Sequence, residues 1–174
     1  MIISVEELKQ YISTDKSDQV LEAMLQALEM TIRSHTNNNF QNRYIRTYCP
    51  VMAQKLYADF PLLAVGDTVQ ISESEFSNGV YVIREIEDGY ISLDKNLLDE
   101  SRVLVTKVEY PMDVKMGVVN MMKWDLENRE KVGIQSETIS RHSVTYFNMD
   151  GDNSLMGYPK SLLGFLKPYK KARF

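Results

Sequence analysis

The chain has 174 residues, of which 44% are hydrophobic and 25% are charged, and its formal net charge is −4. This composition is ordinary for a soluble globular protein, and the length suits one domain, or one domain with a modest second module. The single cysteine, Cys49, excludes an internal disulfide. The N-terminus lacks the basic and apolar segments of a signal peptide, and the apolar residues 60–65 are far too few to span a bilayer. We therefore expect a soluble protein made in a cytoplasm.

The charge is unevenly distributed along the chain. From Val132 onward there are six Lys or Arg residues against three acids, so this part carries +3 and the preceding part −7. An acidic body with a basic tail can orient a protein between two partners. A sequence-reading nucleic-acid binder would usually carry a basic stripe across its fold, so this pattern does not indicate one.

Two helices are predicted at the N-terminus. Ser4 and Glu7 have capping-box spacing, and the apolar residues that follow predict a short helix over Ser4–Ile12. A longer apolar stripe at spacings of three and four predicts the second helix; it comprises Val20, Leu21, Met24, Leu25, Leu28 and Ile32. We expect this helix to end in Thr36–Asn39, because these side chains compete for backbone hydrogen bonds.

A region of short antiparallel strands is predicted next, over residues 43–111. Alternating runs and β-forming residues mark Tyr44–Tyr48, Val51–Tyr57, Thr68–Ile71, Val80–Ile86, Tyr90–Asp94 and Arg102–Tyr110, with Pro50 interrupting the first two. Asp88-Gly89 is a strong hairpin signal, because both residues tolerate positive φ. Five or so such strands are enough to close a small barrel or sandwich.

A third helix is predicted over Asp113–Lys131, capped by the Asp113 carboxylate. Its first half is apolar on nearly every side, so it must be surrounded by its own domain or by other subunits. We expect a residual face at Met116, Val119 and Met122 to contact a neighbouring subunit. Beyond a helix end at Gly133 we predict extended chain over 134–147, a polar loop over 148–157 and a final helix from Pro159 to Pro168.

These elements predict an α+β fold. We expect a small bundle of about four helices carrying an inserted antiparallel β module, either a small barrel or a sandwich. The predicted helical domain comprises residues 1–42 and 112–174, and the predicted β module comprises residues 43–111.

The sequence gives no indication of enzyme chemistry. It contains no phosphate-binding loop, no Cys/His pair at metal-ligand spacing and no nucleophile elbow. The acidic turn at Asp150–Ser154 does not fit the EF-hand frame, and the charges around Glu127 and Glu130 indicate a solvated helix face. His35, His142 and Cys49 each stand without a partner at useful spacing. We therefore expect no catalytic residue, no metal site and no cofactor.

The C-terminal residues allow two interpretations. One is a frayed terminus, as chain ends usually are. The other is a docking peptide, because apolar anchors alternate with basic residues; its residues are Leu166, Tyr169, Lys170, Lys171, Arg173 and Phe174.

A resemblance favours the docking peptide. The segments Ser140–Tyr146, Gly157–Lys160 and Leu163–Tyr169 resemble the C-terminal signature of tailed-phage head-tail connector proteins, also called head-completion or neck adaptor proteins, of phages and prophages of Gram-positive bacteria. Val5–Lys9 and the helix after it resemble the opening helices of that family. The resemblance covers about residues 4–39 and 113–174. Simpler members are nearly all helical, so the β region departs from the family pattern.

The resemblance implies a structural virion protein rather than an enzyme. It implies a homo-oligomeric ring of about a dozen subunits that docks under the portal protein, extends the DNA channel and offers a platform to the next neck or tail-completion protein. DNA would pass without sequence-specific binding, and no membrane would be involved. The expected location is the neck of the virion, with assembly in the host cytoplasm.

The main alternative is a nucleic-acid- or peptide-binding module that uses the β region. Tyr81 and Tyr90 could stack on bases, but Glu73, Glu75, Glu85, Glu87 and Asp88 surround them with negative charge. Salt-sensitive binding to single strands would favour this alternative.

Overall fold

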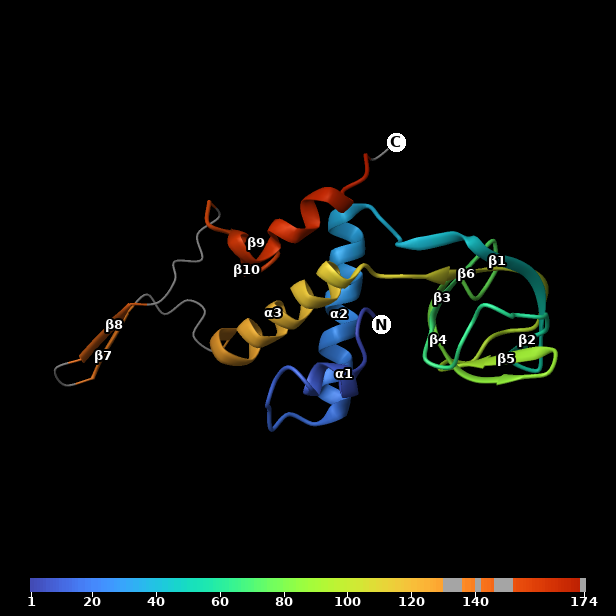
Figure 1. Cartoon of the computed structure of the whole chain (residues 1–174), viewed down its shortest axis with the longest axis horizontal. Coiled ribbons are helices and arrows are strands. Elements are labelled where there is room, and N and C mark those ends of the chain that lie inside the picture. The colour runs from blue at the N-terminus through green and yellow to red at the C-terminus, as the bar shows by residue number, and fades with distance from the viewer. Residues whose placement is uncertain (130–135, 140–141, 146–151, 173–174) are drawn as a thin grey trace. The chain divides into compact units, whose positions relative to one another are not determined.

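The structure is a computed structural model of the chain, and it describes residues 1–129, 136–139, 142–145 and 152–172. The chain folds as two compact units (Figure 1). One, here called the barrel unit, comprises residue 1 and residues 39–110; the other, here called the helical unit, comprises residues 2–38 and 111–174. The boundaries expected from the sequence lay slightly further along the chain, after residues 42 and 111.

The barrel unit is a closed sheet of six antiparallel strands in the order β1-β2-β5-β4-β3-β6. The hairpin signal at Asp88-Gly89 is confirmed, because Gly89 has a φ of +84° between β4 and β5. The strands are β1 (Gln41–Met52), β2 (Lys55–Leu56), β3 (Thr68–Ser72), β4 (Gly79–Glu87), β5 (Tyr90–Leu93) and β6 (Glu100–Val108).

The barrel encloses an apolar core built from alternating strand residues. Its members are each less than a tenth exposed, and all but Leu97, which lies between β5 and β6, hold inward strand positions of the period-two pattern; they are Cys49, Val51, Leu56, Val69, Ile71, Tyr81, Ile83, Ile91, Leu97, Val103 and Val105. Burial raises the pKa of the Cys49 thiol to about 11, so this cysteine is a core residue rather than a nucleophile.

Strand β1 is longer than predicted. The sequence suggested two extended stretches interrupted by Pro50, but β1 continues through that residue. Proline is tolerated in a strand where its missing N–H would face away from the ladder. The Pro50 carbonyl accepts a hydrogen bond from the Tyr57 N–H at 3.1 Å, on the side of β1 opposite β6.

The helical unit contains two long helices and several short elements. Helix α1 (Val5–Lys9) begins where predicted, with Ser4 Oγ accepting from the Glu7 N–H at 3.0 Å. The other elements are α2 (Asp18–Thr36), α3 (Met112–Asn128), β7 (Ser136–Ile139), β8 (His142–Thr145), β9 (Ser154–Leu155), β10 (Tyr158–Pro159) and the 3-10 helix η2 (Lys160–Tyr169).

The predicted stripe of α2 is buried at Leu21, Leu25, Leu28 and Ile32, whereas Val20 is exposed. Helix η2 packs on both long helices. At Gly117 the ring of Phe165 approaches the α3 backbone so closely that a Cβ would collide with it.

The expected fold class, a bundle of about four helices with a β module set into it, is wrong. The main sheet of the described residues has six strands, so the β part is not a minor addition to a bundle. Bundle helices run within about 20° of parallel, whereas α3 crosses α2 (Figure 1). Helix α1 spans only five residues, and the last helix is a 3-10 helix that continues through Pro168. Apolar periodicity predicts helices but does not fix their crossing angles.

The start of α3 also differs from its prediction. Pro111, not Asp113, occupies the cap position and makes no side-chain cap hydrogen bond, but Asp113 Oδ1 accepts from the Val114 N–H of the first turn at 2.9 Å. Asp113 lies in the first turn, where a carboxylate still favours the helix dipole. The predicted helix end at Gly133 and the acidic turn up to Gly151 fall outside the described residues.

Candidate assembly surfaces

The first candidate surface is an open edge on strand β1. Between Asn42 and Arg46 the register of β1 against β6 shifts, so residues 43–45 face no residue of β6. On its other side β1 pairs only with the two-residue strand β2, at Val51 and Met52. Within the described chain, residues 43–49 therefore have no strand partner along this second edge. An unpaired edge is a template for another strand, unless a protein covers or blocks it.

The bulge projects an aromatic side chain into solvent. Tyr44 is 99% exposed, and Arg43 and Arg46 beside it are exposed as well. Bulges commonly re-aim side chains at barrel rims and functional sites. Residue alternation predicts a strand at Tyr44 but no functional role, because periodicity does not reveal a register shift.

A groove of about 200 Å³ lies at this end of the barrel unit, over paired residues of β1 and β6 that include Val105 and Lys107. One wall is the β1 segment Tyr44–Thr47, and the other is the loop segment Asp59–Leu63, where Leu62 is 63% exposed. Both walls belong to the barrel unit. The groove is smaller than typical small-molecule pockets of about 300–1,000 Å³.

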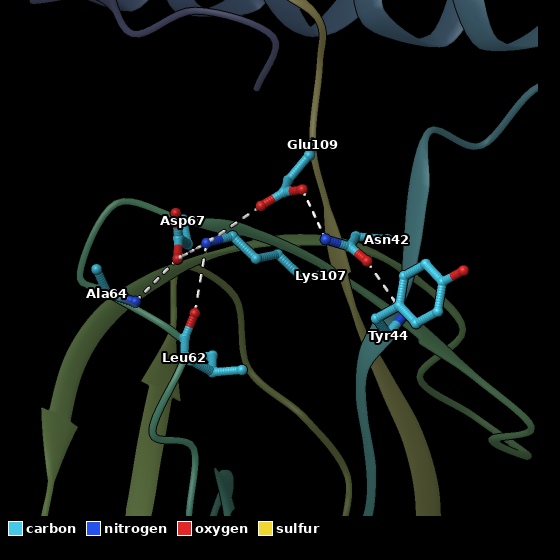
Figure 2. A network of polar contacts seen from close by, with 7 residues as sticks. All are labelled: Asn42, Tyr44, Leu62, Ala64, Asp67, Lys107 and Glu109. Carbon is cyan, nitrogen blue, oxygen red and sulfur yellow. Dashed lines mark hydrogen bonds and ion pairs between the residues drawn. The ribbon is translucent and has the colours of Figure 1, made fainter.

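A polar network at the end of β6 fixes both walls of the groove (Figure 2). On the bulge side, Glu109 Oε2 accepts from Asn42 Nδ2 at 2.8 Å, and Asn42 Oδ1 accepts from the Tyr44 N–H at 3.1 Å. On the loop side, Asp67 Oδ2 lies 2.9 Å from Lys107 Nζ and accepts from the Ala64 N–H at 2.8 Å. The bulge is therefore held in a defined conformation.

Lys107 links the two sides of this network. Its Nζ lies 3.6 Å from Glu109 Oε1 and donates to the Leu62 carbonyl at 3.4 Å. Burial alone would lower the pKa of Lys107, but the hydrogen bond to Asp67 and the charges of Asp67 and Glu109 outweigh it, so the pKa is raised. Lys107 is thus a positively charged structural residue, already paired within the protein.

The second candidate surface is the C-terminal segment of the helical unit, which is fastened to the end of α2. The Thr36 carbonyl accepts from the Lys171 N–H at 2.8 Å. Asn37 Nδ2 donates to the Ala172 carbonyl at 2.7 Å, and Asn38 Nδ2 donates to the Tyr169 carbonyl at 3.1 Å. The predicted helix end at Thr36–Asn39 is confirmed, with Asn37 in the left-handed conformation that commonly closes helices. The same asparagines hold the tail.

The tail is also bonded to α3. The Tyr169 hydroxyl donates to the Asp113 carboxylate, with 2.8 Å to each oxygen, and this bond raises the pKa of Tyr169. Lys170 and Lys171 are exposed. Desolvation, and then the charge of Lys170, lower the pKa of His35 at the end of α2. In this structure, residues 169–172 are therefore an ordered segment that presents two lysines.

The residues of the predicted docking tail fall into three groups. Tyr169, Lys170 and Lys171 lie in the fastened segment. Leu166 is 0% exposed and belongs to the core of the helical unit, so it offers no surface to a partner. Arg173 and Phe174 lie outside the described residues.

The predicted subunit face on α3 receives no support from the structure. Val119 is 4% exposed and Met122 is 0% exposed, so both are core residues of the helical unit. Met116 is half-buried. The helix is surrounded by its own unit, which is one of the two situations that its apolar circumference allowed.

The stacking residues of the alternative function lie in different places. Tyr81 is 8% exposed, and its hydroxyl donates to the Ser77 carbonyl at 2.8 Å, so it cannot stack on a base. Tyr90 is half-buried, with Lys55 Nζ 3.8 Å from its ring centroid.

No group of three or more potential metal-ligating side chains occurs within the described residues. None of the helices in the described ranges is long and apolar enough to cross a membrane. Compared with protein-family models and with curated proteins, the chain matches none of them.

Proposed function

We propose that this protein is a structural subunit of a tailed-phage head-tail connector. In this proposal a ring of about a dozen copies docks under the portal protein, extends the DNA channel and presents a platform to the next neck or tail-completion protein. Its place is the neck of the virion, and it assembles in the host cytoplasm without a cofactor or catalysis. The proposal starts from the resemblance of the segments around Gly157–Lys160 and Leu163–Tyr169 to the connector signature.

The observation that carries the proposal is the fastening of the C-terminal segment. Three hydrogen bonds from or to residues 36–38, together with the Tyr169–Asp113 bond, hold residues 169–172 in one conformation. A segment ordered before it binds loses less conformational entropy on association, which raises affinity. The exposed Lys170 and Lys171 can steer the segment toward an acidic partner surface. These properties suit a docking peptide better than a frayed end.

The experiment is a binding measurement between this protein and the portal protein of the same phage. A chain truncated after Tyr169 retains the buried Leu166 and the bond to Asp113 but lacks the basic end. We expect truncation to weaken portal binding at least tenfold, which is about 1.4 kcal/mol. The control is the double substitution Lys16→Ala with Lys123→Ala, which removes two exposed positive charges from the same unit. Equal binding by truncated and full-length chains would contradict the proposal.

A second variant separates pre-organisation from contact. Asn37→Gly keeps the left-handed backbone at residue 37 but removes the hydrogen bond to the Ala172 carbonyl. We expect portal binding to weaken by about two- to fivefold, because one net hydrogen bond of about 0.5–1 kcal/mol no longer orders the tail. The Lys171 amide should exchange faster with solvent in this variant, which hydrogen exchange measures.

One observation favours the alternative, a nucleic-acid- or peptide-binding barrel. Tyr44 is fully exposed between two arginines, as a stacking residue for single strands would be. The carboxylates of Asp59, Asp67 and Glu109 lie on or near the same groove and disfavour a polyanion. Binding of oligothymidylate that weakens steeply with salt and is lost in Tyr44→Ala would establish this alternative.

A further inference from the structure

The chain contains two incomplete β structures. The barrel has an open edge on β1, at residues 43–49, and β7 and β8 form a sheet of only two strands. An isolated two-stranded sheet is marginally stable in water, and a third strand or a packed face is usually needed. No other strand of the described residues pairs with either edge of this sheet. The β1 edge lacks a neighbouring strand, and the β7–β8 sheet lacks a third strand, so each could complete the other.

The backbone groups on the open edge point away from β6. Pro50 directs its carbonyl to Tyr57, on the side where β2 closes the barrel. Backbone groups alternate along a strand, so Arg46 and Tyr48 direct their N–H and C=O groups to the same edge as Pro50.

The hydrogen bonds of β3 and β4 also indicate that the backbone groups of residues 46 and 48 point away from β6. Ile83 donates to the Asp67 carbonyl and accepts from the Gly66 N–H, so its backbone groups face β3. Along each strand, successive residues direct their backbone N–H and C=O groups to opposite neighbours. Following the observed residue pairs from β4 through β3 to β6 shows that the backbone groups of Thr47 and Cys49 face β6. The backbone groups of residues 46 and 48 are left for an added strand.

The open edge is rigid and accessible. The ring of Tyr48 lies 3.8 Å from the guanidinium carbon of Arg102, and its hydroxyl donates to the Glu73 carboxylate at 2.9 Å. Below it, the bulge is held by Asn42 and Glu109. An added strand would run along this edge, about 4.7–4.9 Å from β1.

The two-stranded sheet suits this edge in charge and composition. Its strands read Ser-Glu-Thr-Ile and His-Ser-Val-Thr, which contain β-branched residues but no Lys, Arg or Pro. Lysine and proline are the residues with which proteins usually block exposed edges. Within the two strands the only formal charge is that of Glu137, Arg141 lies between the strands in the sequence, and the open edge carries Arg43 and Arg46. Opposite charges on adjacent strands stabilise their pairing.

We propose that the β7–β8 hairpin of one copy of this chain adds to the β1 edge of a second copy. The pairing joins different surfaces of the two copies, so it is heterologous, and repetition around a rotation axis closes a ring. The pairing itself follows from the two edges, whereas its closure into a connector ring rests on the proposed function. The hairpin would gain its third strand only in the assembly.

The first test uses two changes that remove opposite sides of the contact. Replacing Ser136–Thr145 with a Gly/Ser linker removes the hairpin, and Arg46→Pro removes one edge N–H while leaving the ladder to β6 intact. Self-association of the full-length chain is measured by sedimentation and native mass spectrometry. We expect each change to raise the self-association Kd about tenfold or more, because backbone hydrogen bonds and their flanking contacts are lost.

Two control variants show which property matters. Arg46→Ala removes the charge but retains the N–H, and we expect about a two- to threefold effect. Thr47→Pro removes a ladder donor to β6, so we expect a lower Tm, unlike Arg46→Pro. Wild-type self-association by the hairpin-deleted chain would overturn the proposal, and so would a wild-type chain that stays monomeric at several hundred micromolar with portal present.

A second test distinguishes pairing between copies from pairing within one chain. Arg46→Cys and Glu137→Cys are made in separate chains, which are mixed under mild oxidation; the buried Cys49 does not interfere. Pairing between copies gives a mixed disulfide dimer that Arg84→Cys, on exposed β4, does not give. A disulfide that forms only within the double variant, without dimers, would overturn the proposal.

The outcomes for ring pairing and for the proposed function are separable. A chain that binds portal through its tail but does not self-associate through the hairpin overturns the pairing and leaves the connector proposal standing. A chain whose association needs both edges but that ignores portal overturns the connector proposal and leaves the pairing standing.

Discussion

The two units bury polar groups in different ways. The buried polar residues of the barrel unit are all uncharged: Thr68, Ser74, Ser77 and Thr106. The helical unit buries charged residues as well, including Glu29, Arg33 and Asp125. A barrel sheet satisfies most of its backbone groups through neighbouring strands, so its interior can be apolar. Short helices and loops leave backbone and side-chain groups that need polar partners.

The cluster around Asp125 shows how a buried charge is used in the helical unit. Asp125 is 8% exposed; its carboxylate pairs with Arg129 and accepts from the Tyr158 hydroxyl. Tyr158 also packs on Trp124, with ring centroids 5.5 Å apart. Burial, followed by the bond to Asp125, raises the pKa of Tyr158 well above its usual range. In the helical unit a polar cluster thus holds the segment that leads to η2 and the tail, whereas the barrel needs no such cluster in its core.

The largest effect should come from a cavity in the barrel core. Leu56 is 0% exposed, and Leu56→Ala should lower the free energy of unfolding of the barrel unit by about 3 kcal/mol. Because the units have separate cores, hydrogen exchange should accelerate in residues 39–110 more than in α2 and α3. Leu62→Ala is the matched control, since Leu62 is 63% exposed, and it should change stability by less than about 0.5 kcal/mol. Equal acceleration in both units would contradict the separation.

The next effect should come from overpacking the helical unit. Gly117→Val places side-chain atoms where the Phe165 ring lies and should destabilise this unit by about 2 kcal/mol. Denaturant unfolding of Gly117→Val, Phe165→Ala and the double variant measures the coupling, and the double variant should lose less than the sum. Gly164→Ala is the control, because nothing lies within 4 Å of its added Cβ.

A smaller effect should follow from opening the polar cluster. Tyr158→Phe retains the ring on Trp124 but removes the hydrogen bond to the buried carboxylate, and it should cost about 1.5 kcal/mol in thermal or chemical unfolding. Tyr169→Phe removes the analogous hydroxyl from the more exposed Asp113, where we expect less than about 1 kcal/mol. If the two substitutions cost the same free energy of unfolding, burial of the carboxylate does not strengthen its hydrogen bond.

The smallest effect should be a pH dependence at His35. Burial and then Lys170 lower its pKa in the folded state below 6.5. The unfolded chain therefore takes up this proton first, so the contribution of His35 to stability is complete above 6.5 and is lost as pH falls through the folded pKa. NMR titration of the His35 ring should show the lowered pKa. Lys170→Gln should raise it, and Lys167→Gln should change it less.

Strand positions in the barrel unit were largely predictable from the sequence. Alternation located β3, β4, β5 and β6 to within two residues, and Asp88-Gly89 located their hairpin, because period-two burial leaves a direct trace in the sequence. The bulge at residues 43–45 and the open edge were not predictable. Both depend on which strand pairs with which, and a one-strand pattern contains no information about pairing.

Helix positions in the helical unit were also predictable, but their arrangement was not. The stripe of α2 and the asparagines that end it are local features. The crossing of α3 over α2 and the 3-10 form of η2 depend on contacts such as Gly117 with Phe165. For the same reason the predicted interface at Val119 and Met122 became core, and Leu166 of the predicted tail did as well. A helix that is apolar on nearly every side must be covered, but its sequence does not show whether its own unit or another subunit covers it.

The two ends of the segment 39–110, where the chain enters and leaves the barrel unit, lie side by side. The Glu109 N–H donates to the Phe40 carbonyl at 2.9 Å, and the rings of Phe40 and Tyr110 are 4.9 Å apart, tilted by 43°. Phe40 adopts a φ of 51°, which is uncommon for an aromatic residue and marks the corner where the chain enters β1. Adjacent termini are what domain transplantation and circular permutation require. We therefore expect residues 39–110 to be expressible as an independent cassette, or replaceable by a short linker, so that each unit can be assayed alone.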